Sequence, residues 1–329
     1  MKVLVIGGAG YIGSHTTYEL IHDGHEVVVM DNLTTGRKSS VNKDAKFYLG
    51  DITKKEDLER VFNEECSIKP FDVVMHFAAK LIVPESVNKP LEYYYNNVEG
   101  VRLMLEVMTN YNIKNVVFSS TAATYGVPKD GICKEDDITS PINPYGETKL
   151  ATEKMIKCVC NAYNMNYCIF RYFNVAGADE SLEIGYNYDK EIITHLIPII
   201  ANVALGIQDK LTIYGDDYNT LDGTCIRDYI HVSDLARAHV LGAKYILNNN
   251  ESILVNLGSN NGYSVKEVID EVEKIMPLKY EIGKRREGDP PILIASNTKA
   301  KEILGWTPKY TLKDMIISDI EYRKKLLNK

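Results

Sequence analysis

The chain has 329 residues, of which 45% are hydrophobic and 25% are charged, and its formal net charge at pH 7 is −7. This composition is typical of a folded globular protein, and the length allows one large domain or two. The acidic balance, with a pI near 5.6, argues against a surface that binds nucleic acid or an anionic membrane.

The six cysteines include no C-x-x-C pair and no zinc-finger spacing, so they indicate reduced thiols. The apolar run at residues 3–6 is too short for the core of a signal peptide. The longest later apolar stretch, residues 196–207, is interrupted by Pro198 and Asn202, which argues against a membrane span. We therefore expect a cytoplasmic protein with no membrane segment.

A glycine-rich turn follows the first apolar run, residues 2–6, which has the pattern of a buried strand. Gly8-x-Gly10-x-x-Gly13 and Gly7-x-x-Gly10-x-x-Gly13 are both possible readings of this turn, and a helical pattern follows at once. Glycines at this spacing let backbone N–H groups and a helix N-terminus approach a pyrophosphate. The turn therefore predicts a dinucleotide site.

The second expected strand, residues 26–30, ends at Asp31, 18 positions after Gly13. A carboxylate at this place binds the ribose hydroxyls of NAD and repels the 2′-phosphate of NADP. Asp31 could instead cap a turn together with Asn32, but its place after the glycine turn favours NAD as the cofactor.

Further apolar runs occur at residues 46–49, 72–77, 115–120 and 167–173, separated by segments of helix length. Continuous apolar strands are typical of a parallel sheet covered on both faces. The pattern predicts an α/β Rossmann fold with a doubly wound parallel sheet and a ligand crevice at the carboxyl ends of its strands.

The regular alternation fades after Gly177. We expect a Rossmann domain over residues 1–175 and a smaller C-terminal substrate-binding domain over 176–329. Part of the segment at about 225–258 is expected to return to the first domain.

Asn143 and Pro144 are a helix-start pair, and Tyr145 and Lys149 then share one helical face. Tyr-x-x-x-Lys alone is common by chance. Here it follows a dinucleotide turn and a strand end rich in hydroxyls, Ser119-Ser120-Thr121. Together these features predict hydride transfer at a substrate carbon that carries a hydroxyl.

A tyrosine with its ordinary pKa near 10 is a poor base at pH 7. One positive charge at 4 Å is worth about 4 kcal/mol at an effective dielectric of ~20, which corresponds to about three pKa units. We expect the Lys149 ammonium and a nicotinamide cation to bring the pKa of Tyr145 near neutrality. Thr121 would then hydrogen-bond the same substrate oxygen.

The chain resembles the extended short-chain dehydrogenase/reductase family, and within it the nucleotide-sugar epimerases, along essentially its whole length. The stretches that carry the resemblance are residues 7–15, 31–33, 76–79, 84–94, 96–98, 145–149, 171–174, 222–224, 227–232 and 285–289.

This resemblance implies a 4-epimerase of UDP-hexoses in which NAD is held tightly and is not consumed. The substrate C4 would pass through a ketone, with Tyr145 as base and then acid, and Lys149 would orient the nicotinamide ribose. The resemblance also implies a homodimer, and it makes the second domain a nucleotide-sugar-binding domain. The cofactor residues that it implies are Gly7, Gly10, Tyr11, Ile12, Gly13, Asp31, Asn32, Asp51, Ile52, Phe77, Ala78, Ala79, Asn96, Tyr145, Lys149 and Tyr172.

For the UDP-sugar, the resemblance implies contacts from Thr121, Asn174, Tyr214, Arg227, Arg286, Asp289 and Leu293. Arg227 could instead be a structural ion-pair partner, and Tyr214 could belong to the core of the second domain. Lys80 could contact the cofactor or be an ordinary surface lysine. The histidines have no metal-ligand spacing, so no metal is expected.

By the same resemblance, Leu293 aligns with a bulkier tyrosine in epimerases that are restricted to glucose and galactose. A further hypothesis is therefore that this chain also accepts N-acetylated UDP-sugars. The main rival is a 4,6-dehydratase or a decarboxylase of the same family. Similar dehydratases have Asp-Glu after the active-site Thr, whereas Ala122 and Ala123 follow Thr121 here. A net dehydrogenase and a non-catalytic NAD-sensing protein are weaker alternatives.

Overall fold

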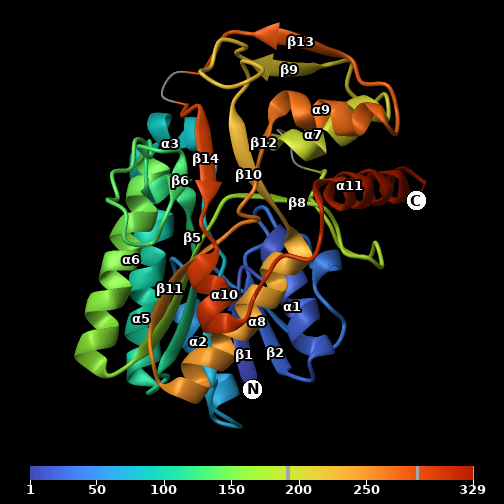
Figure 1. Ribbon diagram of the computed structural model, residues 1–329. Helices are drawn as coiled ribbons and strands as arrows, with labels where there is room; N and C mark the ends of the chain where they lie inside the picture. The colour runs from blue at the N-terminus through green and yellow to red at the C-terminus, as the bar shows by residue number, and fades with distance from the viewer. Residues whose placement is uncertain (190–192, 287–288, 329) are drawn as a thin grey trace. The chain divides into compact units, whose positions relative to one another are not determined.

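The computed structural model describes residues 1–189, 193–286 and 289–328 and divides into two compact units (Figure 1). Unit 1 consists of Met1–Gly126, Thr139–Arg171 and Ala236–Val255. Unit 2 consists of Val127–Ile138, Tyr172–Leu235 and Asn256–Lys329. Whether residues 1–175 and 176–329 fold as separate domains stays a prediction.

Unit 1 is built on a seven-stranded parallel sheet with the order β11-β7-β5-β4-β1-β2-β3. The expected α/β Rossmann fold is therefore confirmed. The chain order reverses at β1, which lies between β2 and β4, and in such folds ligands bind beside this reversal at the carboxyl ends of the strands. The strands are β1 (Lys2–Ile6), β2 (Glu26–Asp31), β3 (Lys46–Leu49), β4 (Val73–His76), β5 (Asn115–Thr121), β7 (Asn166–Tyr172) and β11 (Ile253–Leu257).

Helices cover both faces of this sheet. One face packs against α2, α5 and α6 in a single apolar core that includes Leu4, Met30 and Phe118. On the other face, Gly242 of α8 lies close to the Phe170 side chain of β7. The helices of this part of the chain are α1 (Tyr11–His22), α2 (Lys55–Cys66), α3 (Val83–Asn88), α4 (Pro90–Tyr94), α5 (Gly100–Asn110), α6 (Pro144–Tyr163) and α8 (Val232–Asn249), with short η1 (Lys38–Ser40), η2 (Tyr95–Glu99) and η3 (Ala122–Thr124).

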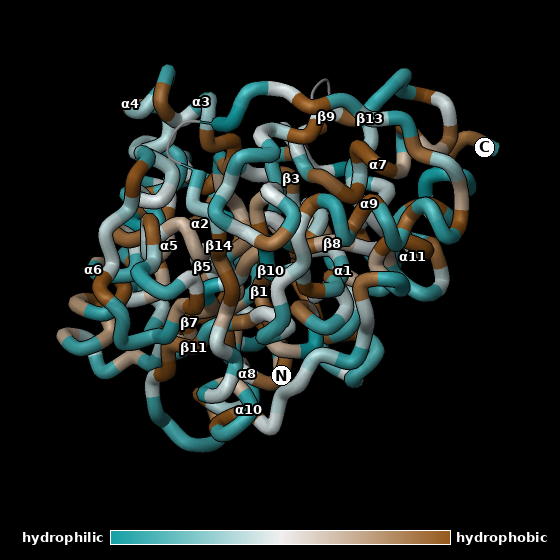
Figure 2. The backbone as a smooth tube through the Cα atoms, turned by 45° about the horizontal axis from the view of Figure 1, so that its top comes forward, coloured by the Kyte–Doolittle hydropathy of each residue, from teal (hydrophilic) through white to brown (hydrophobic). Residues whose placement is uncertain are grey.

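The central strands are rich in hydrophobic residues (Figure 2). All five residues of β1 and all seven of β5 are buried. Continuous burial is what two covering layers of helices require, which explains why the sequence shows unbroken apolar runs rather than alternation.

Unit 2 contains short strands in mixed pairings. β10 (Ile226–His231) pairs in antiparallel fashion with β12 (Gly262–Ser264) and in parallel with β8 (Asn174–Ala176) and β14 (Ile292–Ala295). β14 also pairs with β6 (Ile132–Cys133), and β9 (Leu211–Tyr214) pairs with β13 (Tyr280–Gly283). The helices are α7 (Leu196–Ala204), α9 (Val265–Glu273), α10 (Thr298–Leu304) and α11 (Leu312–Leu327).

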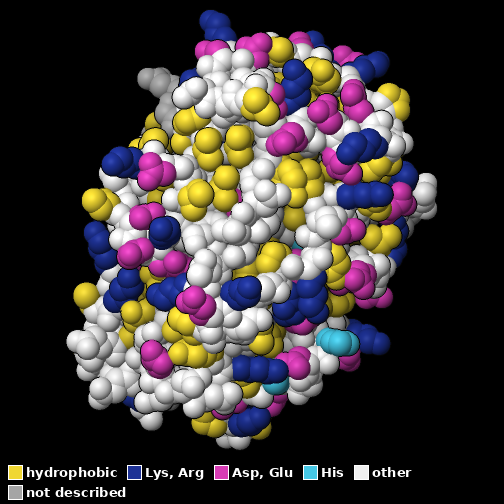
Figure 3. Space-filling model, viewed as in Figure 1, with side chains coloured by type: hydrophobic (Ala, Val, Ile, Leu, Met, Phe, Trp, Pro, Cys, Tyr) yellow, Lys and Arg dark blue, Asp and Glu magenta, His cyan; other side chains and the backbone are white. Residues whose placement is uncertain are grey.

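On the face shown in Figure 3, basic and acidic side chains are interspersed. Across the described part of the chain, every helix is too short or too polar to cross a bilayer.

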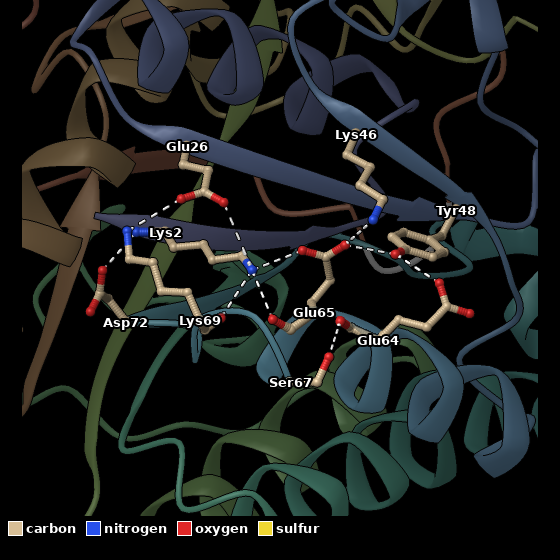
Figure 4. Close-up of polar contacts among 9 residues, drawn as sticks. All are labelled: Lys2, Glu26, Lys46, Tyr48, Glu64, Glu65, Ser67, Lys69 and Asp72. Atoms are coloured by element: carbon tan, nitrogen blue, oxygen red, sulfur yellow. Dashed lines mark hydrogen bonds and ion pairs between the residues drawn. The ribbon is translucent and has the colours of Figure 1, made fainter.

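A buried lysine joins three elements of unit 1 at the amino ends of the strands (Figure 4). Lys2 is fully buried, and its Nζ donates to the carbonyl oxygens of Glu65 and Lys69 at 3.0 and 2.9 Å and lies 2.8 Å from the Glu65 carboxylate. Glu65 also accepts hydrogen bonds from Tyr48 and Lys46, each at 2.6 Å. Removing one member of such a set leaves an uncompensated buried charge.

Burial opposes ionisation of Glu65, but hydrogen bonds from Lys2, Lys46 and Tyr48 outweigh it and lower its pKa from the usual 4.5 to about 2. A lowered carboxyl pKa contributes stability that is complete above the unfolded value and is lost as the pH falls towards the folded value. We expect up to about 3 kcal/mol of the free energy of unfolding to be lost between pH 4.5 and pH 2 on this account.

The test is urea unfolding of the wild type, Glu65→Gln and Glu64→Gln from pH 7 to pH 3. Glu65→Gln should lose about 3–5 kcal/mol at pH 7, and this deficit should shrink below pH 4.5. Glu64 is exposed, so Glu64→Gln should follow the wild type. A deficit for Glu65→Gln that is the same at every pH would contradict the assignment.

Candidate active site

The glycine turn after β1 has room for backbone only. Gly7 has a φ of +83°, and a Cβ on it would lie 2.5 Å from the Ala78 amide nitrogen. A Cβ on Gly13 would lie 2.2 Å from the Gly7 carbonyl oxygen, and one on Gly8 would lie 2.8 Å from Val29. Gly7 and Gly13 are therefore required by the turn and Gly8 by its contact with β2, whereas a Cβ on Gly10, which both readings share, would lie 3.3 Å from its nearest neighbour.

α1 begins directly at this turn, with Gly10 as its N-cap and no side-chain cap. The N–H groups of its first turn are thus free of a capping side chain, and a helix N-terminus of this kind is suited to a phosphate group. A cradle lined by glycine at the start of a helix fits the pyrophosphate of a dinucleotide.

Asp31, at the end of β2, is 8% exposed and lies beside this turn. One carboxylate oxygen accepts the Ala9 amide at 3.0 Å, and the other accepts the Leu33 amide at 2.8 Å. Burial raises the pKa of Asp31, and the two backbone amides oppose this rise. The turn-capping role considered from the sequence is thus present. It leaves lone pairs for ribose hydroxyls, because a carboxylate has about four acceptor sites.

Asp51 follows β3 and is linked to the residue after Asp31. Asn32 Nδ2 donates to Asp51 Oδ2 at 3.1 Å, and the amide and hydroxyl of Thr53 donate to Oδ1 at 2.9 and 2.7 Å. Burial favours the neutral acid, but the hydrogen bonds from Thr53 and Asn32 outweigh it and lower the pKa of Asp51. Asp51 is therefore ionised at neutral pH beside the ends of β2 and β3.

The segment after β4 approaches the glycine turn through its backbone. The Phe77 amide donates to the Ile6 carbonyl at 2.8 Å, and Ala78 is the residue that Gly7 contacts. Asn96 lies in η2, a π-helical turn, a distortion that is frequent at functional sites.

Asn97, which the sequence analysis did not single out, bonds the Lys80 backbone through both ends of its amide at 2.9 and 3.0 Å. Lys80 Nζ lies 2.5 Å from Glu92. No local sequence pattern predicts this role of Asn97, because the contact joins residues that are 17 positions apart in the chain.

Thr121, Tyr145 and Lys149 meet at the carboxyl end of β5. Asn143 accepts the Gly146 amide at 2.9 Å and Pro144 is the first residue of α6, as the sequence predicts. The side chains of Thr121 and Tyr145 are hydrogen-bonded. Lys149 Nζ donates to the Ser119 carbonyl at 2.7 Å and lies 4.8 Å from the centre of the Phe118 ring.

Burial sets the titration of this pair. It raises the pKa of Tyr145 to about 12, against the hydrogen bond from Thr121, and it lowers the pKa of Lys149 to about 7, against the charge of Glu153. Without the cofactor, the chain's own groups therefore leave the pKa of Tyr145 well above neutrality. The expectation that Lys149 and a nicotinamide cation together bring it near neutrality stays a prediction. A lysine with a pKa near 7 carries only part of its positive charge at neutral pH. This charge stabilises the phenolate less than burial destabilises it.

Unit 2 brings together four of the residues expected to bind the UDP-sugar. Arg227 and Asp289 form an ion pair at 2.6 Å, and the Arg286 guanidinium lies 4.0 Å from the centre of the Tyr214 ring. Tyr214 is 44% exposed, so the alternative that it belongs to the core is wrong. The alternative that Arg227 is an ion-pair partner is borne out by its contact with Asp289.

Tyr218, which no sequence pattern singles out, also belongs to this cluster. Its hydroxyl donates to Asp289 at 3.3 Å, and the Arg285 guanidinium lies 3.9 Å from its ring centre. Glu287 and Gly288, which belong to the recognised stretch 285–289, lie outside the described residues.

The remaining expected residues take these places. Leu293 pairs with Arg227 in the β10–β14 register, and Asn174 pairs with Tyr229 in the β8–β10 register. Tyr11 and Ile12 begin α1, a Cβ on Gly100 would lie 2.9 Å from the Ile52 side chain, Ala79 follows Ala78, and Tyr172 ends β7. In the described ranges, His, Cys, Asp and Glu side chains form no group of three that could hold a metal ion.

Comparison with known proteins identifies the class to which this fold and site belong. Residues 3–258 match the NAD dependent epimerase/dehydratase family, and the chain belongs to this family. The expected membership and the expected dependence on NAD are thereby confirmed.

Individual relatives narrow the class. The chain is 49% identical over 312 residues to a UDP-glucose 4-epimerase of Halalkalibacterium halodurans, covering 94% of this chain and 91% of that protein. A crystal structure of a UDP-glucose 4-epimerase superposes with a TM-score of 0.95 at 48% identity, over 100% of this chain and 99% of that one. The UDP-glucose 4-epimerase of Bifidobacterium longum in complex with NAD+ and UDP gives a TM-score of 0.92 at 39% identity, with the same two coverages.

The glycine turn provides a matched pair of substitutions. In Gly13→Ala the new Cβ would lie 2.2 Å from a backbone oxygen, whereas in Gly10→Ala its nearest neighbour would lie at 3.3 Å. We expect Gly13→Ala to bind NAD at least tenfold more weakly and Gly10→Ala to be affected less. Isothermal titration with NAD and the amount of NAD released on denaturation measure this difference. Wild-type affinity for NAD in both variants would show that the turn is not the pyrophosphate cradle.

Proposed function

We propose that this protein is a UDP-glucose 4-epimerase, which interconverts UDP-galactose and UDP-glucose through a transient 4-keto sugar. The observation that carries the proposal is the arrangement of Thr121, Tyr145 and Lys149 at the end of β5, in the unit that also contains the glycine turn and Asp31. The curated relatives, at 44–49% identity over nearly the whole chain, support the same activity.

The cofactor residues inferred from the sequence form the proposed NAD site. The glycine turn takes the pyrophosphate, Asp31 takes a ribose, and the segment after β4 lies against the turn. NAD, when bound, supplies a reversible hydride acceptor. The proposed contacts are Gly7, Gly10, Tyr11, Ile12, Gly13, Asp31, Asn32, Asp51, Ile52, Phe77, Ala78, Ala79, Asn96, Tyr145, Lys149 and Tyr172.

Tyr145 is the acid–base group in this proposal. Its phenolate accepts the proton of the substrate C4 hydroxyl as C4 becomes a ketone, and the phenol returns that proton when C4 is reduced on its other face. Thr121 hydrogen-bonds the same oxygen and keeps it next to Tyr145. Lys149 stabilises the phenolate by its charge and orients the nicotinamide ribose.

The arginine cluster of unit 2 is the proposed UDP site. Guanidinium groups bind phosphates with paired hydrogen bonds, which suits Arg227 and Arg286 to the diphosphate. Tyr214 packs on the uracil, Asp289 contacts the uridine ribose, and Asn174 contacts the diphosphate or the sugar. The ion pair of Arg227 with Asp289 holds both side chains in place.

We also propose that the protein is a cytoplasmic homodimer. The segment from α3 to η2 exposes large apolar side chains, among them Leu91 at 83%, Val87 at 60% and Tyr95 at 59%. Exposed apolar residues gathered on one segment are typical of a surface that another chain covers.

The two residues after Thr121 argue against the alternative that the protein is a dehydratase. After Thr121 the chain enters η3 with Ala122 and Ala123, and neither residue can donate or accept the proton of a water elimination. An NAD-sensing protein would have no use for the buried Lys149 beside Tyr145.

The first experiment is to supply the purified protein with UDP-galactose and no added cofactor, and to detect UDP-glucose with a separate UDP-glucose dehydrogenase. We expect turnover, because retained NAD is regenerated in each cycle. Tyr145→Phe should lower kcat by ~10²–10⁴ and retain its NAD. Absence of turnover by the wild type with and without added NAD would reject the substrate assignment.

The second candidate activity concerns substrates with an N-acetyl group at C2, and it rests on the size of Leu293. A leucine leaves more room than a tyrosine, so we expect UDP-N-acetylglucosamine to be epimerised as well. Leu293→Tyr should lower the rate with UDP-N-acetylglucosamine at least tenfold and leave the rate with UDP-galactose within about twofold, by the usual limits of steric discrimination. No turnover of the N-acetylated sugar by the wild type, under conditions where UDP-galactose reacts well, would exclude this activity.

A further inference from the structure

A third ionisable residue continues the line of Tyr145 and Lys149 along α6. Glu153 lies four positions beyond Lys149, as Lys149 lies four beyond Tyr145, and side chains at this spacing share one helical face. Glu153 is fully buried, and Lys149 is 4% exposed. An ionised carboxylate with no contact to water needs partners that repay its desolvation.

Arg171 of β7 and Ser120 of β5 are these partners. Arg171 Nε lies 2.9 Å from Glu153 Oε1, and Arg171 Nη2 lies 2.6 Å from Oε2, so the pair is bidentate. The Ser120 hydroxyl donates to Oε1 at 2.5 Å. Arg171 is 3% exposed and lies 4.7 Å from the centre of the Tyr125 ring. The carboxylate is therefore fixed from two strands of the sheet.

The end of β5 contacts α6 through three consecutive residues. The Ser119 carbonyl accepts Lys149, the Ser120 hydroxyl bonds Glu153, and the Thr121 side chain bonds Tyr145. Each contact joins one residue of the strand end to one residue of the helical line. A shift of Ser120 relative to Glu153 would therefore displace Thr121, its neighbour in the chain, relative to Tyr145.

We propose that Glu153 is a positioning residue of the active site: its carboxylate, clamped by Arg171 and Ser120, places a negative charge on the helical face of Lys149 and fixes the strand end that carries Thr121. The part of this proposal that concerns turnover rests on the proposed epimerase function. The part that concerns the charge of Lys149 does not.

The electrostatic part follows from the charges around Lys149. Burial lowers the pKa of Lys149 to about 7, and the charge of Glu153 raises it. Without that carboxylate, Lys149 would be largely neutral at pH 7 and would offer Tyr145 no positive charge. The titratable and charged groups that face this line are His76 of β4, Tyr125 after η3, Tyr145 of α6, and Tyr167 and Arg171 of β7.

A purely structural ion pair is the competing interpretation. Such a pair would stabilise the fold, and its loss would lower the melting temperature and kcat together without changing the titration of Lys149. The two interpretations therefore differ in the pKa of Lys149, which can be measured directly.

The experiment compares the NAD-bound wild type with Glu153→Gln, Arg171→Gln and the control Glu147→Gln. Isotope-edited NMR of lysine labelled at Cε gives the pKa of Lys149, with its signal assigned by Lys149→Met. Glu153→Gln keeps the shape of the side chain and removes its charge. Glu147 is an exposed glutamate of the same helix, so its variant makes the same chemical change away from the buried line.

We expect Glu153→Gln to lower the pKa of Lys149 by ~1 unit and to move the alkaline limb of the kcat–pH profile with UDP-galactose in the same direction. Arg171→Gln leaves the buried Glu153 carboxyl without its cation, which favours the neutral carboxyl, so the pKa of Lys149 should fall in this variant as well. Glu147→Gln should change neither quantity.

An unchanged pKa of Lys149 in both Glu153→Gln and Arg171→Gln would overturn the proposal, even if kcat and the melting temperature fall. If Glu153→Gln does not fold, Arg171→Gln alone decides, because its predicted shift of the pKa of Lys149 has the same cause and the same sign. A wild type that does not convert UDP-galactose would reject the epimerase function, and the Lys149 titration would still test the role of Glu153.

Discussion

The close approach of two backbone segments at Gly7 is the constraint on which the cofactor side of this protein depends. β1 and β4 are neighbours in the sheet, and their carboxyl ends bring Gly7 and Ala78 together with no space for a side chain. Because Gly13 lies over the Gly7 carbonyl, α1 must begin where it does. The position of the anion-binding helix end thus follows from a steric condition in the sheet, and no side chain is needed to set it.

The same edge of the sheet organises the polar groups. His76 pairs with Ile6 of β1 and with Phe118 of β5, so the ends of three adjacent strands are aligned. Phe118 lies beneath Lys149, and Ser119 accepts the ammonium group. The glycine turn after β1 and the helix α6 are therefore connected through the hydrogen-bonded strands β1, β4 and β5. Rigid support of this kind is what a reaction sensitive to the position of the reacting atoms requires.

The features predicted correctly from the sequence are those determined by local chemistry. β1 and β3 have the expected bounds, and the Asn143 cap and Pro144 start α6 as expected. A buried strand and a helix cap each depend on residues that are close in the chain, so a short window contains the whole signal. The placement of Tyr145 and Lys149 one turn apart on α6 belongs to the same group, because it depends on helical spacing alone.

The features missed are those that depend on contacts between distant segments. Arg171 lies 18 positions from Glu153, and Tyr218 lies 71 positions from Asp289. Glu153 follows Lys149 at helical spacing, so the sequence contained a signal for it, but an acidic residue in a helix is usually exposed. The burial of Glu153 depends on its contacts with β5 and β7, and these contacts cannot be predicted from the residue pattern of α6 alone. The rise in the pKa of Tyr145 on burial was missed for the same reason, since desolvation is a property of the folded surroundings.

The two opposite shifts in the active site explain why a buried carboxylate belongs beside it. Burial moves the pKa of Tyr145 up and that of Lys149 down, so the neutral forms of both groups are favoured. A positive charge that enters beside Tyr145 would favour the phenolate and would also repel the Lys149 proton. Lowering the pKa of the tyrosine without discharging the lysine therefore needs a negative charge on the far side of Lys149. Glu153 occupies that position on the helix, and Arg171 holds its carboxylate in the core through a bidentate contact.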